Sequence, residues 1–178
     1  MMPRQKPGLS KQDYQTPPEF LSAVRHYLNI TDFVIDLAAE GHNAVCPRFH
    51  TTTGLIQPWY MHLGTGEWAW LNPPFGRIGP WVKKAASERR WLSNFAGIAV
   101  LVPASTGANW WRDHVHMQAH VLLLNGRLTF VGHMAPYPKD CALLLYCLHR
   151  RPRYEVWNWR QEGSSTSESV TSTNHPRP

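Results

Sequence analysis

The stretch Asn72-Pro73-Pro74-Phe75 has the composition of a rigid loop that presents hydrogen-bond acceptors. Its two prolines fix φ and lack backbone N–H donors, so the loop is rich in carbonyls that can only accept. An exocyclic amine on a base is a poor nucleophile, because its lone pair is delocalised into the ring. Asn72 Oδ1 and the Pro73 carbonyl would concentrate electron density on such a nitrogen. Phe75 would then stack on a base turned out of the duplex.

The same four residues also occur in ordinary turns, with the aromatic ring packed into a core. The elements before the loop favour the chemical interpretation. Two short apolar runs, Phe33–Asp36 and Trp68–Leu71, are typical of buried strands; the first ends in a carboxylate and the second leads directly into Asn72. Ligands bind outside the carboxyl ends of strands in open α/β sheets, so we expect Asp36 and Asn72 at one site.

The segment Thr16-Pro17-Pro18-Glu19 has the pattern of a capping box, with Thr16 as N-cap and Glu19 reaching back to its amide. Phe20, Leu21, Val24 and Leu28 then recur at helical spacing. Further along the chain, short apolar runs typical of strands alternate with longer segments in which apolar residues recur at helical spacing. This alternation predicts an α/β fold with helices on both faces of the sheet. We expect helices over 80–93 and 108–119, and strands over 98–102, 121–124 and 142–146.

The 178 residues, 43% of them apolar, suit one domain with a buried core. We expect this domain over residues 13–160, between a flexible basic segment, 1–12, and a disordered polar tail, 161–178. The net charge of +6 suits a partner rich in phosphate, although many basic chains bind no nucleic acid.

Three cysteines are too few for a disulfide framework, so we expect reduced thiols. No apolar run approaches the roughly 20 residues of a membrane span, and the first residues lack the apolar stretch of a signal peptide. These features indicate a cytoplasmic protein with no membrane partner. The sequence does not indicate an oligomeric state.

Several stretches, in the same order along the chain, resemble the phage-type DNA N6-adenine methyltransferases, the phage Dam family. Together they span about residues 13 to 146. They are DYQTPP (13–18), DLAA (36–39), HNAVCPRF (42–49), LNPPFGRIGPW (71–81), LVPA (101–104), GRLTF (126–130) and PYP (136–138).

This resemblance implies a Rossmann-like methyltransferase fold with a seven-stranded, mostly parallel sheet over residues 13–160. It implies S-adenosyl-L-methionine as methyl donor, N6 of adenine in double-stranded DNA as acceptor, and a gene carried by a phage or prophage, expressed in the bacterial cytoplasm. A role in protection from restriction is one possibility that the sequence leaves open. The catalytic loop would comprise Asn72, Pro73, Pro74 and Phe75.

The resemblance also assigns cofactor contacts on two segments. They are Tyr14, Gln15, Thr16 and Pro17 on the first and Asp36, Ala38 and Ala39 on the second. A helix start at Thr16 would offer amides to a carboxylate, and Asp36 is an anion suited to the cofactor's amino group. Each also has a purely structural interpretation, as an N-cap and as the end of a buried strand.

The chain departs from the pattern of other methyltransferases at the turn after the first strand, where Asp-Leu-Ala-Ala replaces a glycine-rich sequence. No second acid is evident for the ribose hydroxyls, and Glu67 is only a weak candidate for contacting the cofactor's adenine. Arg77, Lys83 and Lys84 are weak candidates for phosphate contacts, since a solvated helix face explains the two lysines equally well. We expect no metal site, because the His116 and His120 pair lacks further ligands at suitable spacing.

Two other classes of function remain open on the sequence. A methyltransferase acting on cytosine N4, on an RNA base or on a protein amide would also use Asn-Pro-Pro with an aromatic residue. A non-catalytic DNA-binding relative could keep the fold without the cofactor. No separate target-recognition domain is evident after Tyr146, so any base readout must come from loops of the same domain or from a partner.

Overall fold

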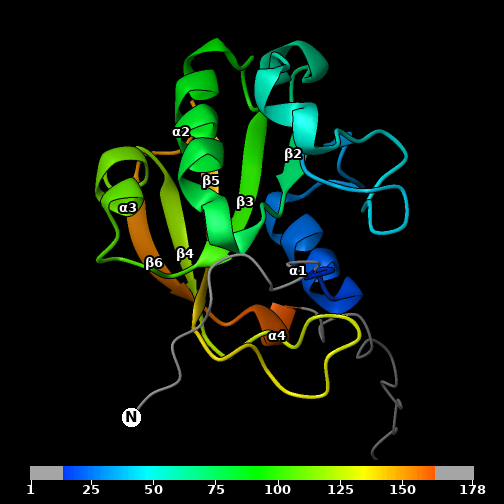
Figure 1. Cartoon of the computed structure of the whole chain (residues 1–178). Helices are drawn as coiled ribbons and strands as arrows, with labels where there is room; N and C mark the ends of the chain where they lie inside the picture. The colour runs from blue at the N-terminus through cyan, green and yellow to red at the C-terminus, as the bar shows by residue number, and fades with distance from the viewer. Residues whose placement is uncertain (1–13, 163–178) are drawn as a thin grey trace, which may run out of the picture.

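A six-stranded sheet forms the centre of the protein in the computed structural model, which describes residues 14–162 (Figure 1). The strands follow the order β1-β2-β3-β5-β4-β6 across the sheet. Their bounds are β1 Ile35–Asp36, β2 Trp68–Leu71, β3 Gly97–Pro103, β4 His120–Leu124, β5 Cys141–Cys147 and β6 Arg153–Trp157.

The sheet is mixed, because β5 runs antiparallel to both of its neighbours, β3 and β4. The other neighbouring pairs, β1–β2, β2–β3 and β4–β6, are parallel. Ile35 pairs with Ala69 and Asp36 with Trp70, so the first two strands end side by side. This register places the segments after Asp36 and after Leu71 at the same edge of the sheet.

Helices cover both faces of the sheet, as the alternation in the sequence predicts. Helices α2 (Ile78–Glu88) and α3 (Asn109–His114) pack on one face, and α1 (Pro18–Leu28) and α4 (Trp159–Glu162) pack on the other. Successive strand residues point to opposite faces, so each strand contributes to both apolar layers. In β2, for example, Trp68 and Trp70 face α1 while Ala69 and Leu71 face α2.

The predicted strands are all present, with small shifts at their ends. The helix expected over 80–93 begins earlier and ends at Glu88, followed by a 3₁₀ turn, η4, over Arg89–Trp91. The helix expected over 108–119 is much shorter, because it ends at His114 and Met117 then adopts a positive φ of 57°, which is incompatible with a helix. The described residues form six strands rather than the seven that the resemblance implies.

Edge strand β6 and helix α4 have no counterpart among the predicted elements. The sequence of β6 alternates charged with aromatic or β-branched residues, but the strand is short and follows two arginines and a proline, so no strand is predicted there. Helix α4 includes residues 161 and 162, which the sequence assigns to a disordered tail; the remainder of that tail and the segment 1–12 lie outside the described residues.

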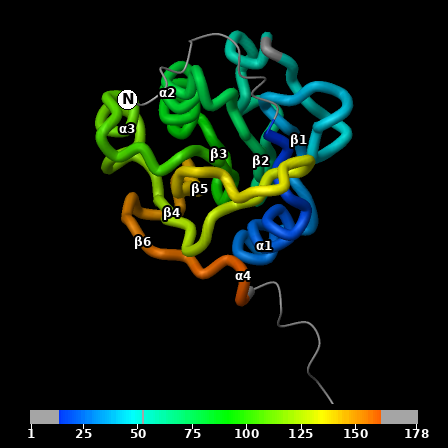
Figure 2. Tube along the Cα trace, turned by 60° about the horizontal axis from the view of Figure 1, so that its bottom comes forward, coloured from blue at the N-terminus to red at the C-terminus, as the bar shows by residue number. Residues whose placement is uncertain are grey.

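Two long connections flank the edge at which β1 and β2 end. Residues 37–67 contain two 3₁₀ turns, η1 (Thr52–Ile56) and η2 (Trp59–His62), beside α2. Residues 125–140, between β4 and β5, extend toward the start of α1 (Figure 2). Val131 in this second connection donates a backbone hydrogen bond to the Gln15 carbonyl at 3.0 Å. Among the described residues, no helix is long and apolar enough to cross a membrane.

The contact between β2 and β3 depends on the absence of a side chain at Gly97. A Cβ at this position would lie 2.4 to 2.7 Å from ring carbons of Trp68, a buried side chain of the neighbouring strand. We therefore expect Gly97→Ala to lower the free energy of unfolding by about 1 to 3 kcal/mol through overpacking. Gly107→Ala is the matched control, since nothing lies within 4 Å of its added methyl. Urea unfolding of both variants checks this, and equal stabilities would contradict it.

Candidate active site

A cavity of about 410 Å³ opens where β1 and β2 end, in the size range of roughly 300 to 1,000 Å³ that small-molecule sites occupy. Three segments supply most of its wall: the residues before α1, the loop after β1 and the loop after β2. The lining residues are Tyr14, Gln15, Thr16, Asp36, Ala38, Ala39, Glu40, Asn43, Val45, Trp70, Asn72, Pro73, Pro74 and Trp81.

The Asn72 side chain has a fixed orientation in this wall. Its Nδ2 donates to the Tyr14 carbonyl at 2.5 Å and to Thr16 Oγ1 at 3.2 Å. Because a carbonyl can only accept, the nitrogen must face Tyr14 and the oxygen must occupy the other side. That oxygen, Oδ1, is buried and has no hydrogen-bond partner among the described residues. Asn72, a residue of the cavity wall, thus carries a buried acceptor that no described group uses.

Thr16 does not cap the first helix, contrary to the capping-box prediction. Helix α1 begins at Pro18 with Pro17 as its N-cap, and no side chain caps it. Thr16 Oγ1 instead accepts the hydrogen bond from Asn72 Nδ2. The start of α1 also offers fewer free backbone amides to a carboxylate than the sequence predicts. Pro17 and Pro18 have no N–H, and the Phe20 amide donates to the Pro17 carbonyl.

Asp36 is a buried carboxylate, with 3% of its surface exposed. Its Oδ1 accepts from the Ala38 amide at 3.1 Å and its Oδ2 from the Val45 amide at 3.2 Å, so it joins the two ends of the segment 38–45 within the connection after β1. Burial raises the pKa of Asp36 from 3.8 to about 6, although the two backbone hydrogen bonds oppose the shift. A cation in the cavity would favour the ionised form.

Phe75 lies beside the cavity in a cluster of rings rather than in its lining. Tyr14 stacks on its face, with ring centroids 5.4 Å apart and an interplanar angle of 29°. Phe130 and Tyr137, from the connection between β4 and β5, contact Phe75 at steeper angles of 72° and 63°. The steep contacts help to fix the plane of Phe75, and Tyr14 is the ring among these three that lies nearly parallel to it.

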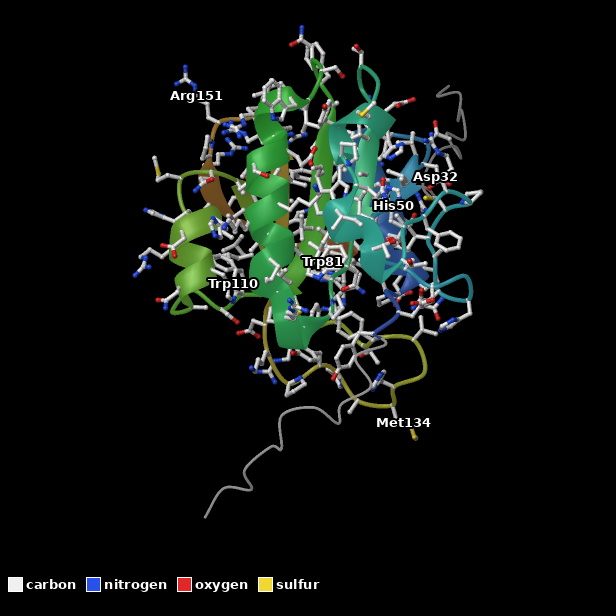
Figure 3. The ribbon with its side chains drawn as sticks, turned by 45° about the horizontal axis from the view of Figure 1, so that its top comes forward. Asp32, His50, Trp81, Trp110, Met134 and Arg151 are labelled. Atoms are coloured by element: carbon white, nitrogen blue, oxygen red, sulfur yellow. The ribbon has the colours of Figure 1, made fainter. Side chains whose placement is uncertain are left out.

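The fold brings together most of the residues that the sequence and the resemblance single out. All the predicted cofactor and catalytic residues except Pro17 and Phe75 line the cavity. Sequence reasoning missed five lining residues: Glu40, Asn43, Val45, Trp70 and Trp81. Two of them could have been found from the sequence. Trp70 lies two residues before Asn72 and so points to the same face of the sheet, and Glu40 directly follows Ala39. Trp81 lies on α2 (Figure 3). Its ring stacks against that of Trp59, with centroids 6.2 Å apart.

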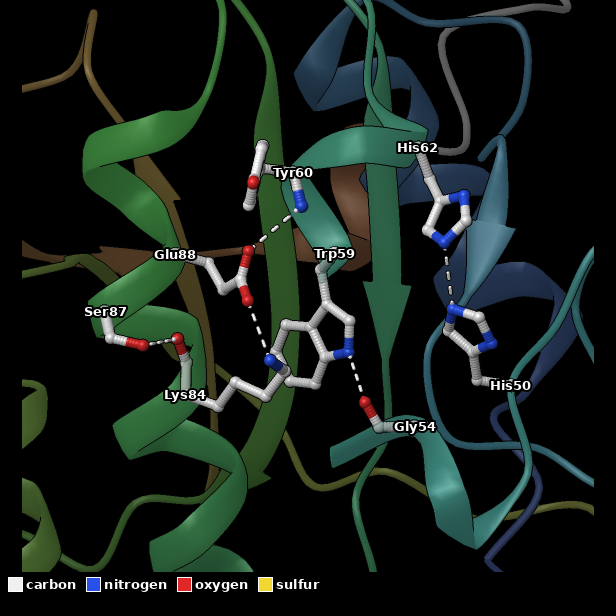
Figure 4. A network of polar contacts seen from close by, with 8 residues as sticks. All are labelled: His50, Gly54, Trp59, Tyr60, His62, Lys84, Ser87 and Glu88. Carbon is white, nitrogen blue, oxygen red and sulfur yellow. Dashed lines mark hydrogen bonds and ion pairs between the residues drawn. The ribbon is translucent and has the colours of Figure 1, made fainter. Parts of the chain in front are cut away.

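The three cations considered for phosphate contacts differ in their surroundings. Arg77 and Lys83 are exposed. Lys84 is mostly buried; its Nζ lies 2.7 Å from Glu88 Oε1 and 5.0 Å from the centroid of the Trp59 ring (Figure 4). Glu88 also accepts from the Tyr60 amide, so this pair joins α2 to η2. These contacts commit Lys84 to packing and leave Arg77 and Lys83 free to meet a ligand.

No group of three or more His, Cys, Asp or Glu side chains suited to a metal gathers within residues 14–162. Two histidines do meet, since His50 Nε2 lies 3.2 Å from His62 Nε2 (Figure 4). Burial, and the neighbouring His62 and Arg48, lower the pKa of His50. The three cysteines, Cys46, Cys141 and Cys147, are buried and free, as expected for reduced thiols.

Comparison with known proteins identifies relatives of one kind. A model of the family described as DNA N-6-adenine-methyltransferase (Dam) matches residues 5–142, which include the whole cavity wall. A protein of Escherichia phage T1, described as a DNA N-6-adenine-methyltransferase, is 27% identical over 124 residues. That match covers 69% of this chain and 49% of the phage protein. The chain therefore spans about half the length of this curated relative.

The raised pKa of Asp36 predicts a pH dependence of stability in the ligand-free protein. The folded state holds the Asp36 proton more tightly than the unfolded chain, so this contribution is full below about pH 4 and is lost as pH rises through about 6. Asp36→Asn cannot titrate and serves as the reference. Between pH 4.5 and 7.5 the native protein should lose about 2 kcal/mol of unfolding free energy relative to this variant. If the unfolding free energies of the native protein and of Asp36→Asn changed equally between the two pH values, the shifted pKa would be refuted.

Proposed function

Because this chain belongs to the DNA N-6-adenine-methyltransferase (Dam) family, we propose that it transfers a methyl group from S-adenosyl-L-methionine to N6 of adenine in double-stranded DNA. The α/β/α arrangement with polar residues at the ends of β1 and β2 supports a Rossmann-like methyltransferase fold. The described relative is a phage protein, which supports action on DNA inside a bacterial host cell.

The observation that carries this proposal is the buried, unpartnered Oδ1 of Asn72, a residue of the cavity wall. Its orientation is imposed by the Tyr14 carbonyl and by Thr16, so the acceptor is held in place before any substrate arrives. An amino group of a base has two hydrogens to donate, and the carbonyl of the adjoining Pro73, which also lines the cavity, would be the second acceptor. Two acceptors at one nitrogen increase its electron density and thereby its nucleophilicity.

The cavity residues fit the proposed cofactor. Buried Asp36 offers an anion to the cofactor's ammonium group, and that pairing would offset the cost of keeping the carboxylate charged. Glu40, in the same loop, offers the second carboxylate that the sequence did not reveal, suited to accept from the ribose hydroxyls. When bound, S-adenosylmethionine supplies a methyl group already activated by its sulfonium.

The protein contributes mainly position and electrostatics to this reaction, and no covalent enzyme intermediate is needed. The Asn72 loop would orient the amine toward the methyl group, and the amine would lose a proton during or after transfer. Phe75 would stack on the adenine, at roughly 1 to 3 kcal/mol per base. Tyr14 stacks on one face of Phe75, so the adenine would stack on the other face or take the place of the Tyr14 ring.

Exposed cations beside the site support contact with a phosphate backbone. Arg77 follows the catalytic loop directly, and Lys83 lies on the helix that begins there. Both are exposed, whereas Lys84 is paired with Glu88. We assign Arg77 and Lys83 to phosphate contacts that position the duplex without reading its sequence.

The test is methylation of unmethylated duplex DNA, followed by digestion to nucleosides and mass spectrometry. The native protein should produce N6-methyladenine. Asn72→Ala should lower the rate at least about 100-fold, the scale for losing one aligned transition-state contact, while the dissociation constant for S-adenosylmethionine changes little.

Asn94→Ala is the matched control, because Asn94 is an exposed asparagine near the start of β3, far from the cavity. It should retain full activity. N4-methylcytosine as the product would reassign the substrate base. Cofactor binding without any DNA product would point to an RNA or protein substrate, and a native protein that binds no cofactor would refute the proposed enzyme altogether.

A further inference from the structure

The end of the sheet opposite the cavity presents two aromatic rings to solvent. The cavity lies where β1 and β2 end, and β3 runs parallel to β2, so the start of β3 is at the other end of the sheet. The seven residues of β3 separate the two ends by roughly 20 Å. Trp91, in η4, and Phe95, in the turn before β3, are both 61% exposed. All nine tryptophans lie within the described residues, and Trp91 is the one that is exposed.

Three segments meet at this end of the sheet. Gly97 of β3 pairs with Cys147 of β5, so the residues before β3 lie beside the residues after β5. Arg89, the first residue of η4, donates from its Nε to the Cys147 carbonyl at 2.8 Å. His149 packs on Phe95, with ring centroids 5.3 Å apart. These contacts hold η4, the turn before β3 and the segment after β5 together in one surface.

This surface, which we call the aromatic end, comprises residues 89–96 and 148–151. The two segments hold four arginines and no Asp or Glu. The guanidinium of Arg90 lies over the Trp91 ring, 5.4 Å from its centroid. Arg151 is exposed and projects from the surface (Figure 3). The aromatic end therefore combines exposed rings with a local excess of positive charge.

The backbone of Phe95 shows that burial does not explain its position. Its φ is 63°, in the left-handed region, which bulky side chains rarely adopt and which glycine adopts at little cost. Since the ring is mostly exposed, packing does not offset this strain. Strained residues that persist in a fold are concentrated at functional sites. Phe95 thus has the features of a residue kept for contact with a partner.

Unpaired bases and phosphates match this chemistry best. Bases that are not paired offer their faces to aromatic rings, whereas a duplex hides them, and phosphates pair with arginines. A second copy of this surface would bring the same positive charges together, and an apolar protein surface would leave the arginines without a counter-charge. The family is described by its action on DNA, so we take the strand to be DNA.

We propose that the aromatic end binds single-stranded DNA, with Trp91 and Phe95 stacking on bases and with Arg90 and Arg151 contacting phosphates. This site is separate from the cavity, so it adds a second contact with nucleic acid to the proposed methyl transfer.

The experiment measures the binding of a fluorescein-labelled oligothymidylate of about 12 nucleotides by fluorescence anisotropy. This strand contains no adenine, so it offers no methyl acceptor to the cavity. Trp91→Ala should weaken binding about 5- to 100-fold, the scale of one stacked base. Trp91→Phe keeps a ring and should retain most of the affinity. Neither variant should change the rate at which duplex DNA is methylated.

Phe95→Gly and Met117→Gly form a matched pair. Both residues have a positive φ, 63° and 57°, and both side chains are mostly exposed, 61% and 68%. Because glycine adopts a positive φ without strain, urea unfolding should show little loss of stability in either variant. Only Phe95→Gly should weaken binding of the strand, since Met117 has no ring and lies outside the aromatic end.

Several outcomes would overturn the assignment. The native protein could fail to bind the strand, or Trp91→Ala and Phe95→Gly could bind it as the native protein does. Binding that is lost in Arg77→Gln but kept in Trp91→Ala would place the strand beside the cavity instead. Self-association of the native protein that Trp91→Ala abolishes, measured by sedimentation, would identify an interface between copies. Tighter binding of oligouridylate would reassign the surface to RNA. Methylation of duplex DNA is measured separately, so none of these outcomes refutes the proposed function.

Discussion

The hydrogen bond from Asn72 Nδ2 to the Tyr14 carbonyl connects the parts of this protein that its site requires. It joins the end of β2 to the segment before α1, two regions 58 residues apart in sequence. The same bond leaves Asn72 Oδ1 as an unused acceptor, because the two ends of one amide cannot exchange roles when one of them faces a carbonyl. A buried acceptor without a partner destabilises the folded protein, and here it occurs at the oxygen with which a substrate amine would pair.

Asp36 has a comparable double role at the end of the neighbouring strand. Its two oxygens accept from the Ala38 and Val45 amides, so the carboxylate shapes the loop that lines the cavity. Two amide donors do not compensate fully for burial, which is why its pKa remains raised. The ionised form of Asp36 is therefore disfavoured by its surroundings, and a shifted pKa of this kind is common among functional residues.

The ring cluster around Phe75 explains how the connection between β4 and β5 takes part in the site. Phe130 and Tyr137 come from this connection and contact Phe75 at steep angles, while Tyr14 covers the ring face. Met134, farther along the same connection, is fully exposed and points away from the body of the protein (Figure 3). Tyr14 thus contacts both Phe75, through its ring, and Asn72, through its carbonyl.

The sequence by itself determined the strands that carry Asp36 and Asn72 and the chemistry of the loop after β2, because apolar runs and proline are local signals. It also predicted helices on both faces of the sheet. Only the tertiary structure decided that Thr16 serves Asn72 rather than the helix, that Lys84 pairs with Glu88 and packs on Trp59, and that Asn43 and Trp81 join the cavity. These outcomes depend on which partners the chain brings together across long separations. A side chain that can make one of several hydrogen bonds makes the one that the packed fold leaves within reach.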